Sequence, residues 1–417
     1  STDAEDIGNY KALLSCVIEV NRLAIEEERE LSKEEQTFWS VAVRYLRKKL
    51  AAEGIELPLI KDNMQTKTVS ADVIEARFPS DEPILLSSSA VTTFYNNQYK
   101  YFLQYVLGLQ EVETIHPDAR NHGTYLHRVF ELVMKDDSNH SFDSKLDKAI
   151  QITNLEDDFK FVYEEDEESH YSLTVLEDIA RSTATILRDD AQIQVESEEE
   201  TFELMIANSV RIRGIIDRVD RLSDGSLGIV DYKSSRNTFD IQKFYNGLSP
   251  QLVTYVQALR DKKGLSESEH IFGAMYLHMQ EPKVDLSSVA TTEKILENLA
   301  KELTYRGLFL EDEKAYLANG RYHLNDSLYS QEELEILLAY NQNLYLKAAE
   351  QIKKGHFLIN PYSEDGKSVQ GDQLKAITRF EADRHMPYAR KWYKLPRKDR
   401  RQGFLSLMQE EEETDDL

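Results

Sequence analysis

Residues 214–233 read Gly-Ile-Ile-Asp-Arg-Val-Asp-Arg-Leu-Ser-Asp-Gly-Ser-Leu-Gly-Ile-Val-Asp-Tyr-Lys, and this stretch decides the fold. Its centre, Asp224-Gly225, is a strong hairpin-turn signal between two runs rich in β-branched residues. An antiparallel hairpin centred on residue 224 pairs residues whose numbers sum to 448, so Asp217 lies opposite Asp231. Opposed residues have Cβ atoms about 5 Å apart, where two like charges destabilise a sheet. The pattern therefore predicts a compensating group beside two carboxylates.

Strand alternation places Asp231 and Lys233 on one face, since they are two residues apart. A hard divalent cation would remove the repulsion, because Mg²⁺ binds one or two carboxylates, keeps several waters and bridges to phosphate oxygens. The lysine would then lie beside a metal-bound water. A register error of one residue gives a different interpretation, in which one acid points to solvent and Lys233 is a simple salt-bridge partner. The spacing alone leaves both interpretations open.

The elements around the hairpin indicate an α/β protein. Short β-branched runs separated by turn residues predict consecutive strands, and Ser249-Pro250 predicts the start of a helix before a further buried strand. Capped or amphipathic segments predict helices on either side, and two acidic runs are interpreted as solvated faces or loops. The predicted strands are residues 201–206, 210–222, 226–233 and 271–277; helices begin near residues 32, 87, 123 and 331; the acidic runs are residues 164–168 and 196–200.

Composition excludes several classes of protein. The 417 residues carry 50 Lys and Arg against 75 Asp and Glu, a net charge of −25, and 41% of them are hydrophobic, which is typical of a folded acidic protein. No apolar run approaches about 18 residues and no signal-like segment opens the chain, so we expect a cytoplasmic protein. The single cysteine, Cys16, cannot form an internal disulfide or hold an iron–sulfur cluster.

The acidic balance argues against broad DNA affinity unless positive charge is concentrated locally. The segment 388–401 meets that condition, because it interleaves Lys and Arg with Tyr388, Trp392 and Tyr393. This composition suits phosphate contacts and base stacking. It suits docking on an acidic surface or a partner protein equally well. The residues that bind nucleic acid are therefore left unassigned.

Three motifs together resemble RecB-type nucleases of the PD-(D/E)XK superfamily. The hairpin residues 214–220 and 229–235 resemble the paired acidic and lysine motif. Residues 123–127, Gly-Thr-Tyr-Leu-His, resemble the upstream motif that supplies a histidine ligand, and residues 250–255, Pro-Gln-Leu-Val-Thr-Tyr, resemble the helical motif after the lysine strand. The resemblance implies a restriction-endonuclease-like core, in which a mixed sheet is flanked by helices, with additional helical segments.

The resemblance also implies a role for each motif residue. The metal ligands would be His127, Asp217 and Asp231, binding one or two Mg²⁺ ions, or Mn²⁺ in their place, with Lys233 orienting the attacking water and Gln251 and Tyr255 aligning the scissile phosphate. Without the resemblance, His127 is a lone imidazole, and the last two residues are one helical turn packed on a sheet. Asp220 and Glu203 are further acids near the hairpin, which we leave as structural or outer-shell candidates.

Residues 86–103 are similar to the opening of the nuclease domain of AddB and RexB, the B subunits of Gram-positive ATP-dependent helicase–nucleases, and the match extends to about residue 382. Iron–sulfur members of that group carry cysteines at the places of Asn97, Val369, Asp372 and Thr378, so we expect no cluster here. The lost link between the two ends of the domain must be offset by packing between the regions near Phe94 and Phe380.

We therefore expect a helical segment at residues 1–80 that ends a larger helicase-like region, a nuclease domain at 81–385 with its core at 199–285, and a basic-aromatic then acidic tail at 386–417. The resemblance implies an exonuclease that hydrolyses single strands of DNA delivered by an A subunit of the AddA or RexA type, in double-strand-break repair and recombination. Two alternatives stay open. One is a stand-alone RecB-like exonuclease, and the other is a non-catalytic scaffold that binds DNA or a partner.

Overall fold

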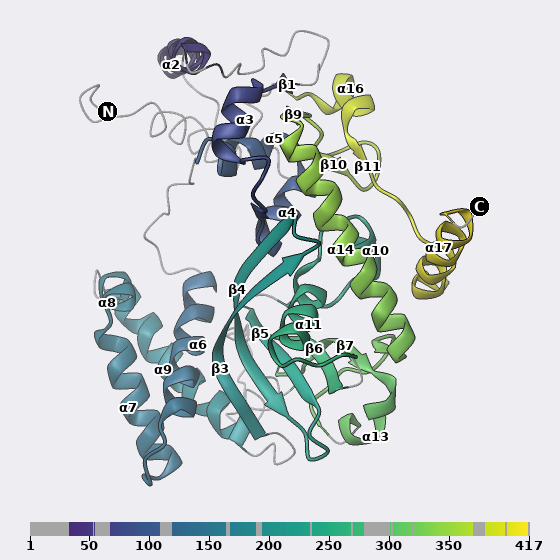
Figure 1. The fold of residues 1–417 in the computed structure, drawn as a ribbon. Coiled ribbons are helices and arrows are strands. Elements are labelled where there is room, and N and C mark those ends of the chain that lie inside the picture. The colour runs from purple at the N-terminus through teal and green to yellow at the C-terminus, as the bar shows by residue number, and fades with distance from the viewer. Residues whose placement is uncertain are drawn as a thin grey trace.

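A mixed, twisted sheet lies at the centre of the computed structural model (Figure 1). The structure describes residues 33–415 apart from 53, 55–66, 109–118, 164–166, 189–193, 234–235, 268–269, 279–300, 302, 319, 370–379 and 397. Within those residues the sheet has seven strands in the order β2-β4-β5-β6-β7-β8, with β3 paired to β4 outside this path. Parallel and antiparallel pairs alternate along it, which confirms the α/β fold with a mixed sheet.

The strands are β1 (Lys67–Thr68), β2 (Ile84–Leu85), β3 (Gln194–Ile206), β4 (Val210–Arg221), β5 (Leu227–Lys233), β6 (Ile271–His278), β7 (Arg306–Leu310), β8 (Leu328–Tyr329), β9 (His356–Phe357), β10 (Tyr362–Ser363) and β11 (Arg390–Lys391). The helices are α2 (Lys33–Ala52), α3 (Ala71–Arg77), α4 (Ser88–Asn96), α5 (Gln98–Tyr101) with a π-helical turn (Phe102–Val106), α6 (Ala119–Lys135), α7 (Phe142–Leu155), α8 (Asp157–Tyr163), α9 (Glu167–Arg188), α10 (Ile241–Tyr245), α11 (Gln251–Lys262), α13 (Lys314–Leu317), α14 (Gln331–Lys353), α16 (Ala382–His385) and α17 (Arg400–Asp415).

The register predicted for the hairpin is confirmed. The four paired positions of β4 and β5 run from Arg218 opposite Val230 to Arg221 opposite Leu227, and each pair sums to 448. Gly225 in the turn has a φ of +89°, a left-handed conformation that glycine adopts without steric cost. The alternative with a shifted register is therefore wrong.

The interpretation of residues 196–200 as a loop or solvated face is wrong in part, because these acids belong to β3. Cross-strand and neighbouring cations compensate their charge. The Arg221 guanidinium forms two hydrogen bonds with Glu196, of 2.8 and 2.9 Å, and the Lys262 ammonium lies 2.8 Å from Glu200. Opposite charges on facing strands stabilise a pairing that the acidic run alone would disfavour.

Helices cover both faces of the sheet (Figure 1). One face forms the α11 core, which includes Ile229, Leu252 and residues of α4, α10, α14 and α17. The other forms the α6 core, which includes Val230 and Tyr232 with residues of α6, α7, α8 and α9. Alternate residues of β5 thus face opposite cores, as strand geometry requires.

The side of β4 that faces the α11 core changes at Asp217. Ile212 and Ile216 belong to this core before that position, and Val219 belongs to it afterwards, so the side-chain alternation shifts by one residue. Directly across the pairing, Glu199 of β3 has a φ of 50°. The side-chain alternation of β4 therefore changes at the residue that the motif makes a metal ligand.

The α11 core extends past both predicted domain boundaries. It includes Leu46 and Leu50 of α2 and Phe404 of α17, while the boundaries at residues 80 and 385 themselves stay predictions. Phe94 and Phe380 are both buried in this core, while direct packing between their regions stays a prediction. Asp372 and Thr378, like residues 1–32 and Cys16, lie outside the described residues, and Asn97 caps α5 by accepting from the Tyr99 amide at 3.0 Å.

No helix among the described segments combines the length and the apolar character needed to span a membrane.

Candidate active site

Two adjacent strands bring an acid pair and a lysine to one place. Asp217 lies within β4, and Asp231 follows the last paired position of β5 in the hairpin register. Asp231 is only 4% exposed, and its Oδ2 lies 2.9 Å from Lys233 Nζ. The Tyr232 amide donates to Asp217 Oδ2 at 2.8 Å. The backbone of β5 therefore fixes the Asp217 carboxylate through a hydrogen bond. The same strand places Asp231 and Lys233 beside it.

His127 approaches this pair from the helix α6. Leu126 and Phe130 are fully buried in the α6 core, which fixes this face of the helix against the sheet. The His127 Nε2 lies 3.9 Å from Asp217 Oδ1, and the imidazole contacts the Tyr232 ring with 4.9 Å between centroids. This buried nitrogen has no hydrogen-bond partner within the part of the chain that the structure describes. Burial lowers the pKa of His127, which favours the neutral imidazole that binds metals.

Gln251 and Tyr255 approach from the first turns of α11. Gln251 Nε2 lies 3.5 Å from Asp231 Oδ1 and donates to the Tyr255 hydroxyl at 3.1 Å. Pro250 stands at the start of the helix, where it lacks the amide that an N-terminal turn leaves unpaired, although the expected serine cap is not formed. The structure thus brings together all six residues that the motifs singled out.

The environment disfavours two negative charges here. Burial raises the pKa of Asp217 to about 6, although the Tyr232 amide and the Lys233 ammonium oppose the shift. Burial together with the negative charge of Asp217 raises the pKa of Asp231 to about 7. A pair of carboxyls with raised pKa values beside a lysine is typical of a functional site.

The donor set fits a hard divalent cation. Two carboxylates and the unpartnered His127 Nε2 meet here, and a cation would relieve the repulsion that raises the Asp231 pKa. No group of three or more His, Cys, Asp and Glu side chains in the described ranges stands close enough to hold a metal unaided. This does not oppose Mg²⁺, because that ion usually takes one or two carboxylates and completes its shell with waters and substrate phosphates.

The structure adds a group that sequence reasoning missed. Tyr276 of β6 lies opposite Asp231 in the parallel register, and Lys233 Nζ lies 5.5 Å from the centre of its ring. A cation over an aromatic face is attracted by the ring quadrupole, so the phenol helps to hold the ammonium beside the acids. Only the register between β5 and β6 reveals this contact, and no sequence motif encodes that register.

The two acids left as structural candidates make structural contacts. Asp220 is fully buried and accepts two hydrogen bonds of 2.8 Å from Arg218. Glu203 is paired with Arg213 at the surface, with 3.0 Å between Oε2 and Nε.

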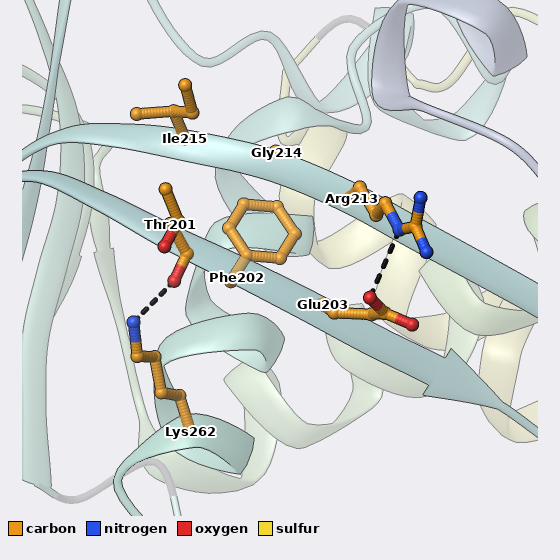
Figure 2. Close-up of a pocket in the computed structure, with 7 residues that line it drawn as sticks. All are labelled: Thr201, Phe202, Glu203, Arg213, Gly214, Ile215 and Lys262. Carbon is orange, nitrogen blue, oxygen red and sulfur yellow. Dashed lines mark hydrogen bonds and ion pairs between the residues drawn. The ribbon is translucent and has the colours of Figure 1, made fainter.

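A cavity of about 610 Å³ lies beside the β3–β4 ribbon. Figure 2 shows the residues that line it. Its cations are engaged, because Arg213 bonds Glu203 and Lys262 bonds the Thr201 carbonyl. Phe202 lies beneath Gly214, where an added Cβ would stand 2.7 Å from the ring. The same ring packs edge-on against Tyr255 with 5.7 Å between centroids. The glycine of the hairpin motif thus makes room for a ring that supports a candidate site residue.

A second cavity, of about 650 Å³, borders His127. Its lining is mainly acidic and includes Glu131, Glu156, Asp157 and Glu199. Arg128, which also lines it, is paired with Glu131 and Glu156.

Part of the basic segment 388–401 is structural. The half-buried Arg390 donates to the carbonyl of Asn246 at 2.6 Å and to that of Tyr95, whose ring lies 4.8 Å from the guanidinium. Arg401 donates to the Leu328 carbonyl. These two arginines therefore have partners within the chain, the interpretation of the segment as a DNA contact stays a prediction, and Arg397 lies outside the described residues.

Comparison with known proteins agrees with the motifs. The family model of the PD-(D/E)XK nuclease superfamily matches residues 85–368. Curated relatives, each named as the B subunit of an ATP-dependent helicase/deoxyribonuclease, are 71% identical in Streptococcus mutans and 65% identical in Streptococcus agalactiae, each over 100% of the chain, and 55% identical in Streptococcus pyogenes over 99% of it. The aligned part is 39%, 38% and 38% of those relatives, so the chain spans about two fifths of their length.

Proposed function

Because this chain belongs to the PD-(D/E)XK nuclease superfamily, we propose that it is a Mg²⁺-dependent deoxyribonuclease, active as an exonuclease on single strands. One observation carries the proposal. The buried Asp231 carboxylate, the partly buried Asp217 carboxylate, the Lys233 ammonium and the unpartnered His127 Nε2 lie close together beside the central sheet. Hydrolysis of a phosphodiester needs this combination of anionic metal ligands and positive charge.

The chemistry divides among the residues as follows. His127, Asp217 and Asp231 would hold one or two divalent ions, which lower the pKa of a bound water and neutralise charge developing on the phosphate. Lys233, already beside Asp231, would orient the attacking water or stabilise the anionic transition state. The Gln251 amide and the Tyr255 hydroxyl bond each other beside Asp231 and would align the scissile phosphate.

The relatives' names support a place in a larger assembly. They describe the B subunit of an ATP-dependent helicase/deoxyribonuclease. We propose that an A subunit of the AddA or RexA type unwinds duplex DNA and delivers a strand to this site, in the cytoplasm, during double-strand-break repair and recombination. No Gly-x-x-x-x-Gly-Lys-Ser/Thr phosphate loop occurs in these 417 residues. The alternative of a non-catalytic scaffold has less support, because Lys233 and the three candidate metal ligands are all present and lie near one another.

A nuclease assay tests the proposal. The purified chain is incubated with single strands labelled at the 5′ or the 3′ end, in Mg²⁺, in Mn²⁺ or in excess EDTA. We expect shortened products with either metal and none with EDTA, because the reaction needs the cation to activate water. Cleavage that persists in EDTA would contradict the metal-dependent mechanism, and intact strands under every condition would contradict nuclease activity of the chain. The two labels together report the polarity.

A further inference from the structure

A buried ion pair lies behind the candidate active site, on the side of the α6 core. The Arg218 guanidinium is 3% exposed and the Asp220 carboxylate 0% exposed, and two hydrogen bonds of 2.8 Å join them. Removing two charges from water is costly, and hydrophobic residues of similar volume often give equal stability. The burial of the Arg218–Asp220 pair therefore suggests a role besides stability.

Tyr232 connects this pair to the candidate metal ligands. Its hydroxyl accepts from Arg218 Nη1 at 3.2 Å, and the guanidinium lies 5.7 Å from the centre of its ring. Tyr232 also contacts the candidate active site. Its ring packs against the His127 imidazole, and its backbone amide donates to Asp217. One residue thus contacts the buried pair and both of these ligands.

We propose that Arg218 and Asp220 orient the metal ligands, because they fix Tyr232, which in turn sets the positions of His127 and Asp217. Arg218 is then a positioning residue that acts through Tyr232. This inference rests on the proposed function, since it concerns how the same site is held ready for a cation. Groups that only orient a metal ligand typically change metal affinity 10- to 100-fold when they are lost.

The chain offers a matched control for Tyr232. Tyr305 also accepts from Arg218, through Nη2 at 2.6 Å, and its ring lies 5.4 Å from the same guanidinium. Its ring stacks on Tyr322, with 5.1 Å between centroids, whereas that of Tyr232 contacts His127. Tyr232→Phe and Tyr305→Phe therefore each remove one hydroxyl from the same arginine, but only the first hydroxyl belongs to a ring that contacts a candidate ligand.

The test compares Mn²⁺ binding by calorimetry in the parent chain and in both variants. We expect Tyr232→Phe to weaken Mn²⁺ binding about 10-fold, and Tyr305→Phe to stay within about twofold of the parent. A second readout uses the metal-free protein with labelled His and aromatic residues. The nuclear Overhauser contact between the rings of residues 127 and 232 should persist in the parent and in Tyr305→Phe and weaken in Tyr232→Phe.

The outcomes separate this inference from the proposed function. Unchanged Mn²⁺ affinity and unchanged ring contact in Tyr232→Phe would overturn it, and so would equal losses in both variants, because equal losses indicate a role in stability only. If the parent itself bound no Mn²⁺, the proposed function would fail, and the ring contact in the metal-free protein would decide the positioning role by itself.

Discussion

Replacement of Asp231 by asparagine is expected to lower the rate of DNA cleavage by more than about 100-fold, because even groups that merely hold a metal ligand are worth 10- to 100-fold. The substitution keeps the size of the side chain and removes the charge that a cation and Lys233 both require. Asp231 is 4% exposed, so a variant of the same shape should fold normally. The measurement is the initial rate on an end-labelled single strand at saturating Mg²⁺.

The matched control is Glu203→Gln, which removes a carboxylate charge from the same ribbon at a surface pair with Arg213. This variant should cleave at a rate close to that of the parent, because surface ion pairs contribute little. Equal rates for Asp231→Asn and the parent would show that the cleavage site lies elsewhere.

The same substitution is expected to stabilise the metal-free protein at pH 8. The raised pKa values, about 6 for Asp217 and about 7 for Asp231, mean that the folded state binds protons more tightly than the unfolded chain, whose Asp pKa is about 3.9. Tighter proton binding by these two carboxyls stabilises the folded state. This stabilisation is fully present below about pH 4 and is lost as the pH rises through about 7. At 1.36 kcal/mol per pKa unit, this loss is about 3 kcal/mol for Asp217 and about 4 kcal/mol for Asp231.

Urea unfolding in EDTA at pH 5 and pH 8 measures this effect. The free energy of unfolding should decrease from pH 5 to pH 8 in the parent. We expect this decrease to exceed the decrease measured for Asp231→Asn by about 2 kcal/mol or more. Addition of Mn²⁺ at pH 8 should raise the stability of the parent and have little effect on the variant, because a ligand stabilises only the state that binds it. Parallel losses in the two proteins would show that the acids do not repel each other in the folded state.

Much of the site followed from local sequence rules. The Asp224-Gly225 turn fixes the hairpin register, and that register places Asp217 beside Asp231. The one-turn spacing of Gln251 and Tyr255 puts both on the face of α11 that meets the acid pair. These relations are short in sequence, so turn geometry and helical periodicity are enough to predict them. His127 is different, because only the resemblance to a nuclease motif singled it out.

The features that escaped prediction depend on contacts distant in sequence. Tyr276 reaches Lys233 only through the parallel register of β5 and β6, which a long connection leaves undetermined. The acidic sequence at the start of β3 indicates a loop, because the sequence does not show that Arg221 and Lys262 pair with these acids. The basic segment shows the same limit, since burial against Tyr95 and Asn246 makes Arg390 a structural residue. Local composition does not report such partners.

We propose that Asp217 and Asp231 together hold a divalent cation. Anomalous diffraction from crystals of the chain soaked in Mn²⁺ tests it most directly. We expect an anomalous peak between the two carboxylates and within reach of His127 Nε2, and its loss in Asp231→Asn. A peak found only at the acidic end of α17, with none between these carboxylates, would contradict the account.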